Sequence, residues 1–124
     1  MKSLKIEETK STPKVVLSPI DGEFIISGRS IPDDAAAFYT PIIEWLNEYI
    51  ETPEAKTVFH FKMNYFNTAT SKFFLNILYK LEKVLNKGND VLVKWYHDSE
   101  DEDMAEAGES YSEVIDIPLE LVAY

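Results

Sequence analysis

The sequence predicts a single α/β domain built on a mixed β-sheet, with helices mainly on one face. Three observations lead to this fold class. The 124 residues suit one domain with one core. Segments with the two-residue period of strands alternate along the chain with segments of helical period. The predicted strands also carry polar residues on one side, including His60, Lys62 and Lys94, which indicates a sheet covered on only one face.

A hairpin opens the predicted sheet after an irregular lead-in at residues 10–13. We expect strands at residues 14–17 and 23–27, joined by a turn at residues 18–22. This turn contains a proline followed by Asp-Gly. Proline presets φ and glycine tolerates positive φ, so the segment has the chemistry of a tight turn.

A loop at residues 28–34 leads into the first helix, which we expect to continue to about Glu51. A proline and two acids near its start suit a helix N-terminus. Pro41 should either kink this helix or mark a restart capped by Thr40. The predicted apolar stripe consists of Phe38, Ile42, Trp45, Leu46, Tyr49 and Ile50.

The central unit is a strand, a loop and a second helix. Residues 57–63 alternate, with Phe59, Phe61 and Met63 on one face, as a half-buried strand requires. Residues 70–86 carry apolar residues at spacings of three and four, which predicts an amphipathic helix. The loop between them and the start of the helix hold four residues that can cap a helix, namely Asn67, Thr68, Thr70 and Ser71.

The C-terminal part is predicted to add a third core strand and two minor elements. The core strand covers residues 91–96, a helical turn or two covers residues 104–109, and a short strand covers residues 112–117. Pro118 should stop that last strand, which favours the edge of the sheet. Right-handed crossovers make the strands at 23–27, 57–63 and 91–96 mutually parallel, with both long helices on the same face.

Charge and composition exclude several classes of function. The net charge is −10; residues 1–97 hold 12 acids and 12 bases, whereas residues 98–124 hold 10 acids and no base. Binding to nucleic acid or anionic membrane needs clustered cations, so neither is expected as a partner. The acidic run is either a solvated surface or a patch that steers a basic partner.

The chain contains no cysteine, which rules out disulfides and thiolate catalysis. It opens without the apolar run of a signal peptide, and no stretch reaches membrane-spanning length. A cytoplasmic protein without membrane insertion is therefore expected.

The most promising site lies where the parallel strands end. Residues 28–30, 65–68 and 96–98 should meet at that edge of the sheet, where α/β proteins usually bind ligands. Hydroxyls at a helix N-terminus beside cations make a credible phosphate environment. The residues predicted to form it are Thr68, Arg29, Ser30, Tyr65, Asn67 and Lys72. The alternative is that Thr68 or Asn67 serves only as an N-cap.

Other constellations carry less chemistry. His60 and His97 could combine with Asp98 as an acid–base set, but no nucleophile or oxyanion device accompanies them. Residues 98–103 lack the glycine and the terminal glutamate of a calcium loop. We therefore expect no metal, no cofactor and no catalytic residue.

The order and spacing of several short motifs resemble the SiaC family of bacterial regulatory phosphoproteins over nearly the whole chain. The central motif is Tyr65-Phe66-Asn67-Thr68, followed by a hydroxyl-rich helix start. The other matching segments are residues 10–13, 28–32, 44–46, 93–95 and 117–118. The resemblance implies a fold similar to the STAS domains of anti-sigma-factor antagonists.

The resemblance also implies a function. A threonine at the position of Thr68 is phosphorylated by a dedicated kinase and dephosphorylated by a PP2C-like phosphatase in that family. The unmodified form binds an effector protein, a diguanylate cyclase in the best-known branch, and so acts in biofilm regulation. Relatives carry a serine at the position of Ala69, so this chain lacks that hydroxyl. The resemblance therefore implies Thr68 as the acceptor, with Thr70 and Ser71 as alternates.

Three functional hypotheses follow. The first is a non-enzymatic phospho-switch in which Thr68 accepts the phosphate and partner binding responds. The second is a STAS-type module that binds a ligand or protein without modification. The third is a small enzyme that uses His97 and Asp98.

Overall fold

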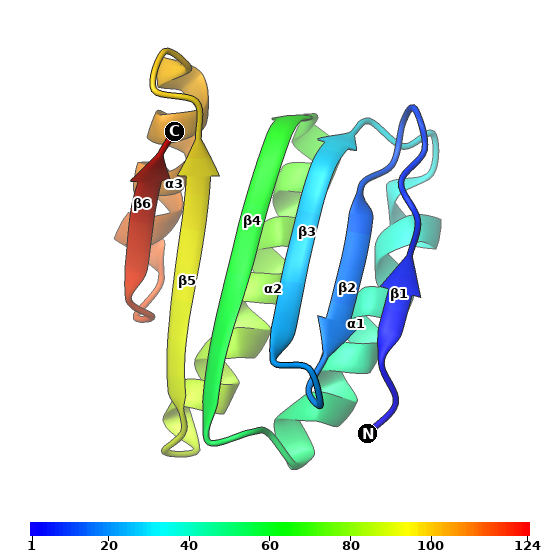
Figure 1. Cartoon of the computed structure of the whole chain (residues 1–124), viewed down its shortest axis with the longest axis vertical. Helices are drawn as coiled ribbons and strands as arrows, with labels where there is room; N and C mark the ends of the chain where they lie inside the picture. Colours follow the sequence, from blue (N-terminus) through cyan, green and yellow to red (C-terminus); the bar gives the residue numbers. More distant parts are fainter.

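Six strands lie side by side in the same order in the sheet as in the sequence. The computed structural model describes all 124 residues (Figure 1). The strands are β1 (Leu4–Ile6), β2 (Lys14–Ser18), β3 (Glu23–Ser30), β4 (Lys56–Phe66), β5 (Asp90–His97) and β6 (Leu119–Ala123). The β1–β2 and β2–β3 pairs are antiparallel, whereas β3, β4, β5 and β6 are parallel. The predicted mixed sheet, with three mutually parallel core strands, is confirmed.

Three helices cover one face of this sheet and leave the other face open (Figure 1). They are α1 (Ala35–Glu51), α2 (Thr68–Asn86) and α3 (Glu102–Val114). The two long helices, α1 and α2, contact each other behind the strands, as expected for helices on one face. None of the helices is both long and apolar enough to cross a bilayer.

The core forms because alternate residues of the strands meet the apolar stripes of the helices. Phe59 and Phe61 of β4 and Trp95 of β5 are fully buried, as are Ile42 of α1 and Phe74 of α2. Their side chains belong to one continuous cluster of 24 buried residues. Trp45 and Trp95 both belong to this cluster and pack in the core.

The first helix differs from its prediction at two points. Its N-cap is Asp34, whose Oδ1 accepts a hydrogen bond from the backbone N of Ala37 at 3.0 Å, so the predicted proline precedes the helix. The helix also continues through Pro41, and the predicted restart capped by Thr40 does not occur. Packing of the buried stripe on both sides of Pro41 offsets the one backbone hydrogen bond that proline cannot donate.

Two predicted loops are strand. Residues 28–30 belong to β3, and residues 64–66 belong to β4, which therefore runs directly into α2 through Asn67. The alternation that predicted the end of the strand at Met63 breaks because the register shifts between Gly28 and Arg29. The parallel ladder resumes past this irregularity with Tyr65 beside Arg29.

The C-terminal prediction is wrong in detail. Residues 112–114 continue α3, which is longer than the predicted helical turns, and no strand occupies residues 112–117. Pro118 precedes β6 instead of ending it, so its missing donor lies outside the strand. The strand at the edge of the sheet is β6, which pairs only with β5 and was not predicted. The short edge strand β1 was not predicted, because three residues are too few for a periodic signal.

Candidate functional site

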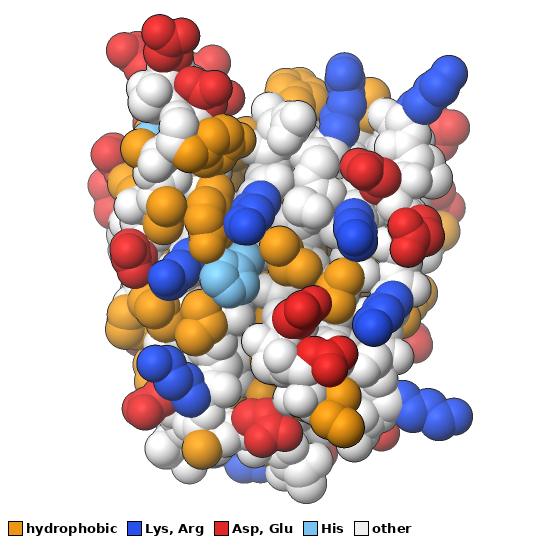
Figure 2. All heavy atoms as spheres, in the orientation of Figure 1, with side chains coloured by type: hydrophobic (Ala, Val, Ile, Leu, Met, Phe, Trp, Pro, Cys, Tyr) orange, Lys and Arg blue, Asp and Glu red, His pale blue; other side chains and the backbone are white.

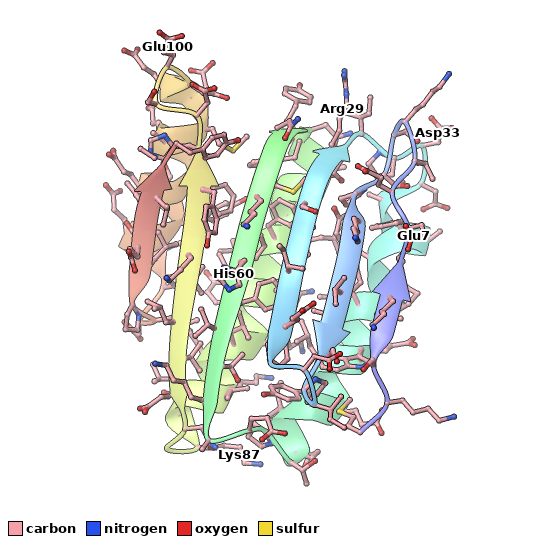
Figure 3. All side chains as sticks on the ribbon, viewed as in Figure 1. Glu7, Arg29, Asp33, His60, Lys87 and Glu100 are labelled. Atoms are coloured by element: carbon pink, nitrogen blue, oxygen red, sulfur yellow. The ribbon has the colours of Figure 1, made fainter.

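The carboxyl ends of β3 and β4 form one side of the candidate site. Arg29 pairs in register with Tyr65, and its guanidinium carbon lies 6.0 Å from the centre of the Tyr65 ring. Figure 3 shows Arg29 at this end of β3. Tyr65 keeps 53% of its surface exposed. A cation and an aromatic ring are thus presented side by side to solvent.

The β-bulge explains why the side chain of Tyr65 is exposed. Gly28 pairs with Met63 and Arg29 pairs with Tyr65, so Asn64 is an extra residue in β4. An extra residue moves the following side chains to the opposite faces. Tyr65 therefore faces solvent, and Phe66 packs against Phe74 and Trp95 with ring centres 5.0 and 5.8 Å away.

Asn67 connects β4 to α2 in a single residue. Its backbone N donates to the carbonyl of Ser30 at 3.0 Å, which holds it at the end of the sheet. Its side-chain oxygen accepts a hydrogen bond from the backbone N of Thr70 at 2.9 Å, as an N-cap does. Asn67 is therefore the cap, and the hydroxyl of Thr68, the first residue of the helix, is not needed for capping.

The hydroxyl of Thr70 lies inside the protein. Thr70 and Ser30 are fully buried, and their hydroxyl oxygens are 2.8 Å apart. The Ser30 hydroxyl also lies 2.7 Å from the phenol oxygen of Tyr39 on α1. This buried hydroxyl cluster, Ser30–Tyr39–Thr70, joins β3, α1 and α2. Ser30, predicted to lie in the phosphate environment, is instead part of this internal cluster.

The hydroxyl of Ser71 is also engaged. It lies 2.9 Å from the phenol oxygen of Tyr111 on α3, and that phenol donates to the carbonyl of Ser71 at 3.0 Å. Thr68, by contrast, is exposed and its side chain has no hydrogen-bond partner within the protein. Among the three predicted acceptors, Thr68 alone presents a free hydroxyl to solvent.

Burial raises the pKa of both tyrosines of this region above the ordinary value for a phenol. Burial raises the pKa of Tyr39 to about 12, against the smaller opposing effect of its hydrogen bonds to Ser30 and Thr70. Burial likewise raises the pKa of Tyr111, which Ser71 opposes. The phenols of Tyr39 and Tyr111 are therefore neutral, and the first turn of α2 packs on uncharged, hydrogen-bonded side chains.

The N-terminus of α2 lacks a negative charge. No acidic residue occupies its first turn, and the exposed Lys72 follows in the next turn. Unpaired backbone amides and the helix dipole make such an end favourable for an anion. A phosphate on Thr68 would meet that end, because Thr68 is the first helical residue.

The acidic run begins beside this site. A cleft of about 430 Å³ separates the end of β4 from α3. Its lining residues are Asn64, Tyr65, Phe66, Asp101, Asp103, Met104 and Ala107. Figure 3 shows Glu100 in the acidic loop at this end of the molecule. No group of three or more His, Cys, Asp or Glu side chains has a geometry that could hold a metal ion.

Only part of the site predicted at the carboxyl ends of the strands comes together, since residues 28–30 meet residues 65–66 but residues 96–98 lie apart from them. β3 and β4 pair to their ends, but the ladder between β4 and β5 ends at Phe61 and Trp95. His97 and Asp98 lie beyond that point, and the Nδ1 of His97 is 2.9 Å from the backbone oxygen of Asp98.

The two histidines do not converge. His60 lies in the middle of the open sheet face (Figure 3), paired in register with Lys94, three residues before His97 on β5. Three residues of strand correspond to about 10 Å. Burial, followed by Lys62 and Lys94, lowers the pKa of His60. The acid–base set considered from the sequence is therefore not assembled.

Sequence reasoning missed Tyr39 and Tyr111. Phe38 was assigned to the buried stripe of α1, yet Tyr39 is the fully buried residue. The spacing Tyr39, Ile42, Leu46 and Tyr49 could have shown this, since it follows the three–four rule. Tyr111 gave no signal, because it lay between a predicted helix and a predicted strand.

A family model described as "SiaC family regulatory phosphoprotein" matches residues 6–124. The chain belongs to the SiaC family. A relative from Pseudomonas aeruginosa strain UCBPP-PA14, the protein PA14_02130, is 26% identical over 124 residues, which are 100% of this chain and 98% of the relative. The family assignment predicted from the motifs is thus confirmed.

Solved structures of the family share the fold. SiaC of Pseudomonas aeruginosa is 25% identical, with a TM-score of 0.91 over 100% of both chains. A second structure, of the diguanylate cyclase SiaD in complex with its activator SiaC from the same organism, matches at a TM-score of 0.90 and 25% identity, over 98% of this chain and 99% of that chain. The relative therefore acts as the activator of a cyclase.

Proposed function

We propose that this chain is a non-enzymatic cytoplasmic signalling protein in which phosphorylation of Thr68 switches binding to an effector. The observation that carries the proposal is the free, exposed hydroxyl of Thr68 at the start of α2, while the hydroxyls of Thr70 and Ser71 are engaged. The description of the family as regulatory phosphoproteins supports a modified residue. A kinase and a PP2C-like phosphatase would set the level of modification.

A phosphate on Thr68 would alter the surface and leave the fold intact. It adds roughly −1.5 to −2 charges at neutral pH. The amides and dipole of the α2 N-terminus would stabilise that charge by about 0.3–1 kcal/mol, or up to about 2 kcal/mol if partly buried. Arg29, Tyr65, Asn67 and Lys72 would surround it, with Arg29 and Lys72 as the two cations.

The effector would bind the surface around Thr68 in the unmodified state. A dianion there would require desolvation or would oppose an acidic group of the effector, so phosphorylation would weaken binding. A diguanylate cyclase is the effector class that we propose, because the SiaC relative forms a complex with the cyclase SiaD.

The acceptor is tested by phosphopeptide mapping and intact-mass measurement on protein from its native host. We expect one phosphate at Thr68, and none in Thr68→Ala. Thr68→Ser is the matched control, since it keeps a hydroxyl at the same position. Phosphate found at Thr70, Ser71 or elsewhere in the wild-type chain would remove Thr68 from the proposal.

The switch is tested by comparing effector affinity for unmodified and stoichiometrically phosphorylated protein. We expect weaker binding after phosphorylation, wild-type binding by Thr68→Ala, and a partial loss in Thr68→Asp, because one carboxylate imitates a phosphate poorly. Equal affinities of the two forms would contradict the switch while leaving the acceptor assignment intact.

A further inference from the structure

The open face of the sheet is a surface that the proposed switch does not use. Four of its strands, β3 to β6, are parallel. All-parallel sheets occur almost only with both faces covered, because the helices that connect their strands lie on the two faces. Here the helices cover one face alone (Figure 1). The open face therefore departs from the usual architecture.

The open face combines aliphatic side chains with cations. Half-buried aliphatic residues from four strands point to it, namely Ile25, Val58, Leu92 and Val122. Lys62 and His60 of β4 and Lys94 of β5 lie among these aliphatic side chains. In Figure 2, hydrophobic, basic and acidic side chains surround the single histidine in the middle of this face.

The polar groups of the open face are held in place. The Nδ1 of His60 lies 2.8 Å from the phenol oxygen of Tyr96, and the Nζ of Lys62 lies 4.6 Å from the centre of the Tyr96 ring. Register places Lys94 directly beside His60. Glu120 on the edge strand β6 lies beside Lys94 in register, while Glu23 lines a cavity with His60 and Lys62, and Glu8 lines another with Lys62. Cations still exceed acids among the strand residues that register places on this face, which are Lys5, Lys14, Lys56, Lys62 and Lys94 against Glu23, Asp90 and Glu120. The strands of the open face are therefore net positive on a chain of net charge −10.

The size and composition of this face fit a reversible protein interface. Six strands spaced by about 4.8 Å are about 24 Å wide, and the longest strand spans about 35 Å. An area of that order matches the roughly 800 Å² that each partner contributes to a standard interface. Interfaces of this class mix apolar and polar groups, whereas a face that packs permanently against its own helices is apolar.

We propose that the open face binds an acidic amphipathic segment of a partner protein. Aliphatic side chains of that segment would lie on Ile25, Val58 and Leu92, and its carboxylates would pair with Lys62 and Lys94. Charge decides against a second copy packed face to face, because lysines would meet lysines. It also decides against an anionic membrane, since the acidic loop at residues 98–103 extends from the same molecule.

Site-specific photo-crosslinking in the native host tests the partner class. A photoreactive residue replaces Leu92 on the open face, and the control carries it at Lys83 on the exposed side of α2. We expect Leu92 to crosslink a partner through a segment rich in Asp and Glu, which peptide mapping identifies. No crosslink, a basic or uncharged segment, a lipid, or this chain itself would each overturn the proposal.

Charge reversal then tests the mechanism of recognition. In K62E/K94E the crosslink and the affinity for the synthetic mapped segment should fall about tenfold or more. The matched variant K80E/K83E reverses two lysines on α2 and should leave both unchanged. K62Q/K94Q provides a milder version in case K62E/K94E does not fold, as judged by circular dichroism. Unchanged affinity in folded K62Q/K94Q would overturn the proposal. Thr68→Ala should bind normally, so failure here is distinguishable from failure of the phospho-switch.

Discussion

Helices α2 and α3 both begin at the carboxyl end of a parallel strand, and their N-termini are built differently. α3 begins with the charged cap Asp101 and carries Glu102 and Asp103 in its first turn. α2 begins with the neutral cap Asn67, has no acid in its first turn, and exposes Thr68 there. The positive end of α3 is thus already compensated by carboxylates, whereas that of α2 is not. A reversible negative charge at Thr68 would therefore stabilise the N-terminus of α2 more than an added charge would stabilise that of α3.

The two N-termini also rest on different supports. The first turn of α2 rests on the buried hydroxyl cluster and on Tyr111. α3 is attached through Met104 and Gly108, both buried, and the indole N of Trp95 donates to the carbonyl of Met104 at 2.9 Å. The exposed acids of α3 therefore belong to a helix whose other side is packed. The sequence hypothesis of a purely solvated acidic surface describes the side chains and omits this packing.

Alkaline pH should give the largest effect on stability. The pKa of Tyr39 is about 12 in the folded protein and about 10 when unfolded, so the unfolded chain loses its proton first. The free energy of unfolding should therefore decline as pH rises from 10 to 12, by about 1.4 kcal/mol for each pKa unit of difference. Denaturant unfolding at several pH values measures this, with Tyr39→Phe as control. A decline in Tyr39→Phe as steep as in wild type would contradict the assignment to Tyr39.

The two threonines of the first turn of α2 should differ sharply. Thr70→Val leaves the buried hydroxyl of Ser30 with one partner fewer and should cost about 1–3 kcal/mol of unfolding free energy. Thr68→Val removes an exposed hydroxyl and should change it by within about 0.5 kcal/mol. Thermal unfolding of the pair gives the comparison. Equal losses would mean that Thr68 is also a packing residue, and its availability to a kinase would be in doubt.

Removing either cap should cost a similar amount, because both side chains accept a backbone hydrogen bond. Asn67 accepts from Thr70 at 2.9 Å, and Asp101 accepts from Met104 at 3.0 Å. Asn67→Ala and Asp101→Ala should each lower the unfolding free energy by about 1 kcal/mol, within the range of about 0.5–2 for such caps. Asp101→Asn, which keeps the acceptor oxygen, is the control and should lose less. Chemical denaturation distinguishes these outcomes, and no loss in Asn67→Ala would reassign the cap of α2.

Charges at the two helix ends should have opposite and small effects. Neutralising α3 with Glu102→Gln or Asp103→Asn should cost about 0.3–1 kcal/mol each, whereas adding a charge to α2 with Thr68→Asp should stabilise by about the same amount. Both effects should shrink in high salt. Thermal midpoints at low and high ionic strength test the signs. Destabilisation by Thr68→Asp at low salt would show that the end of α2 is already compensated.

Much of the fold follows from patterns local to the chain. The periods of β4 and α2 depend only on neighbouring residues, as does the turn at residues 18–22. The predictions of secondary structure failed where contacts between residues far apart in the sequence determine the structure. The bulge at Asn64 exists because β4 must stay in register with β3, and the strand prediction at residues 112–117 failed because α3 packs on Trp95.

The sequence by itself determined the mixed α/β sheet, the open polar face, the concentration of acid after His97 and the hydroxyl-rich start of α2. Only the tertiary structure decided which hydroxyl is free. Thr68, Thr70 and Ser71 look alike in the chain, but Ser30 and Tyr39 engage Thr70, and Tyr111 engages Ser71. The physical reason is that helical geometry turns each successive residue by about 100°, so three neighbouring side chains meet three different environments. Residues far away in the sequence supply those environments, and Thr68 is the one that points to solvent.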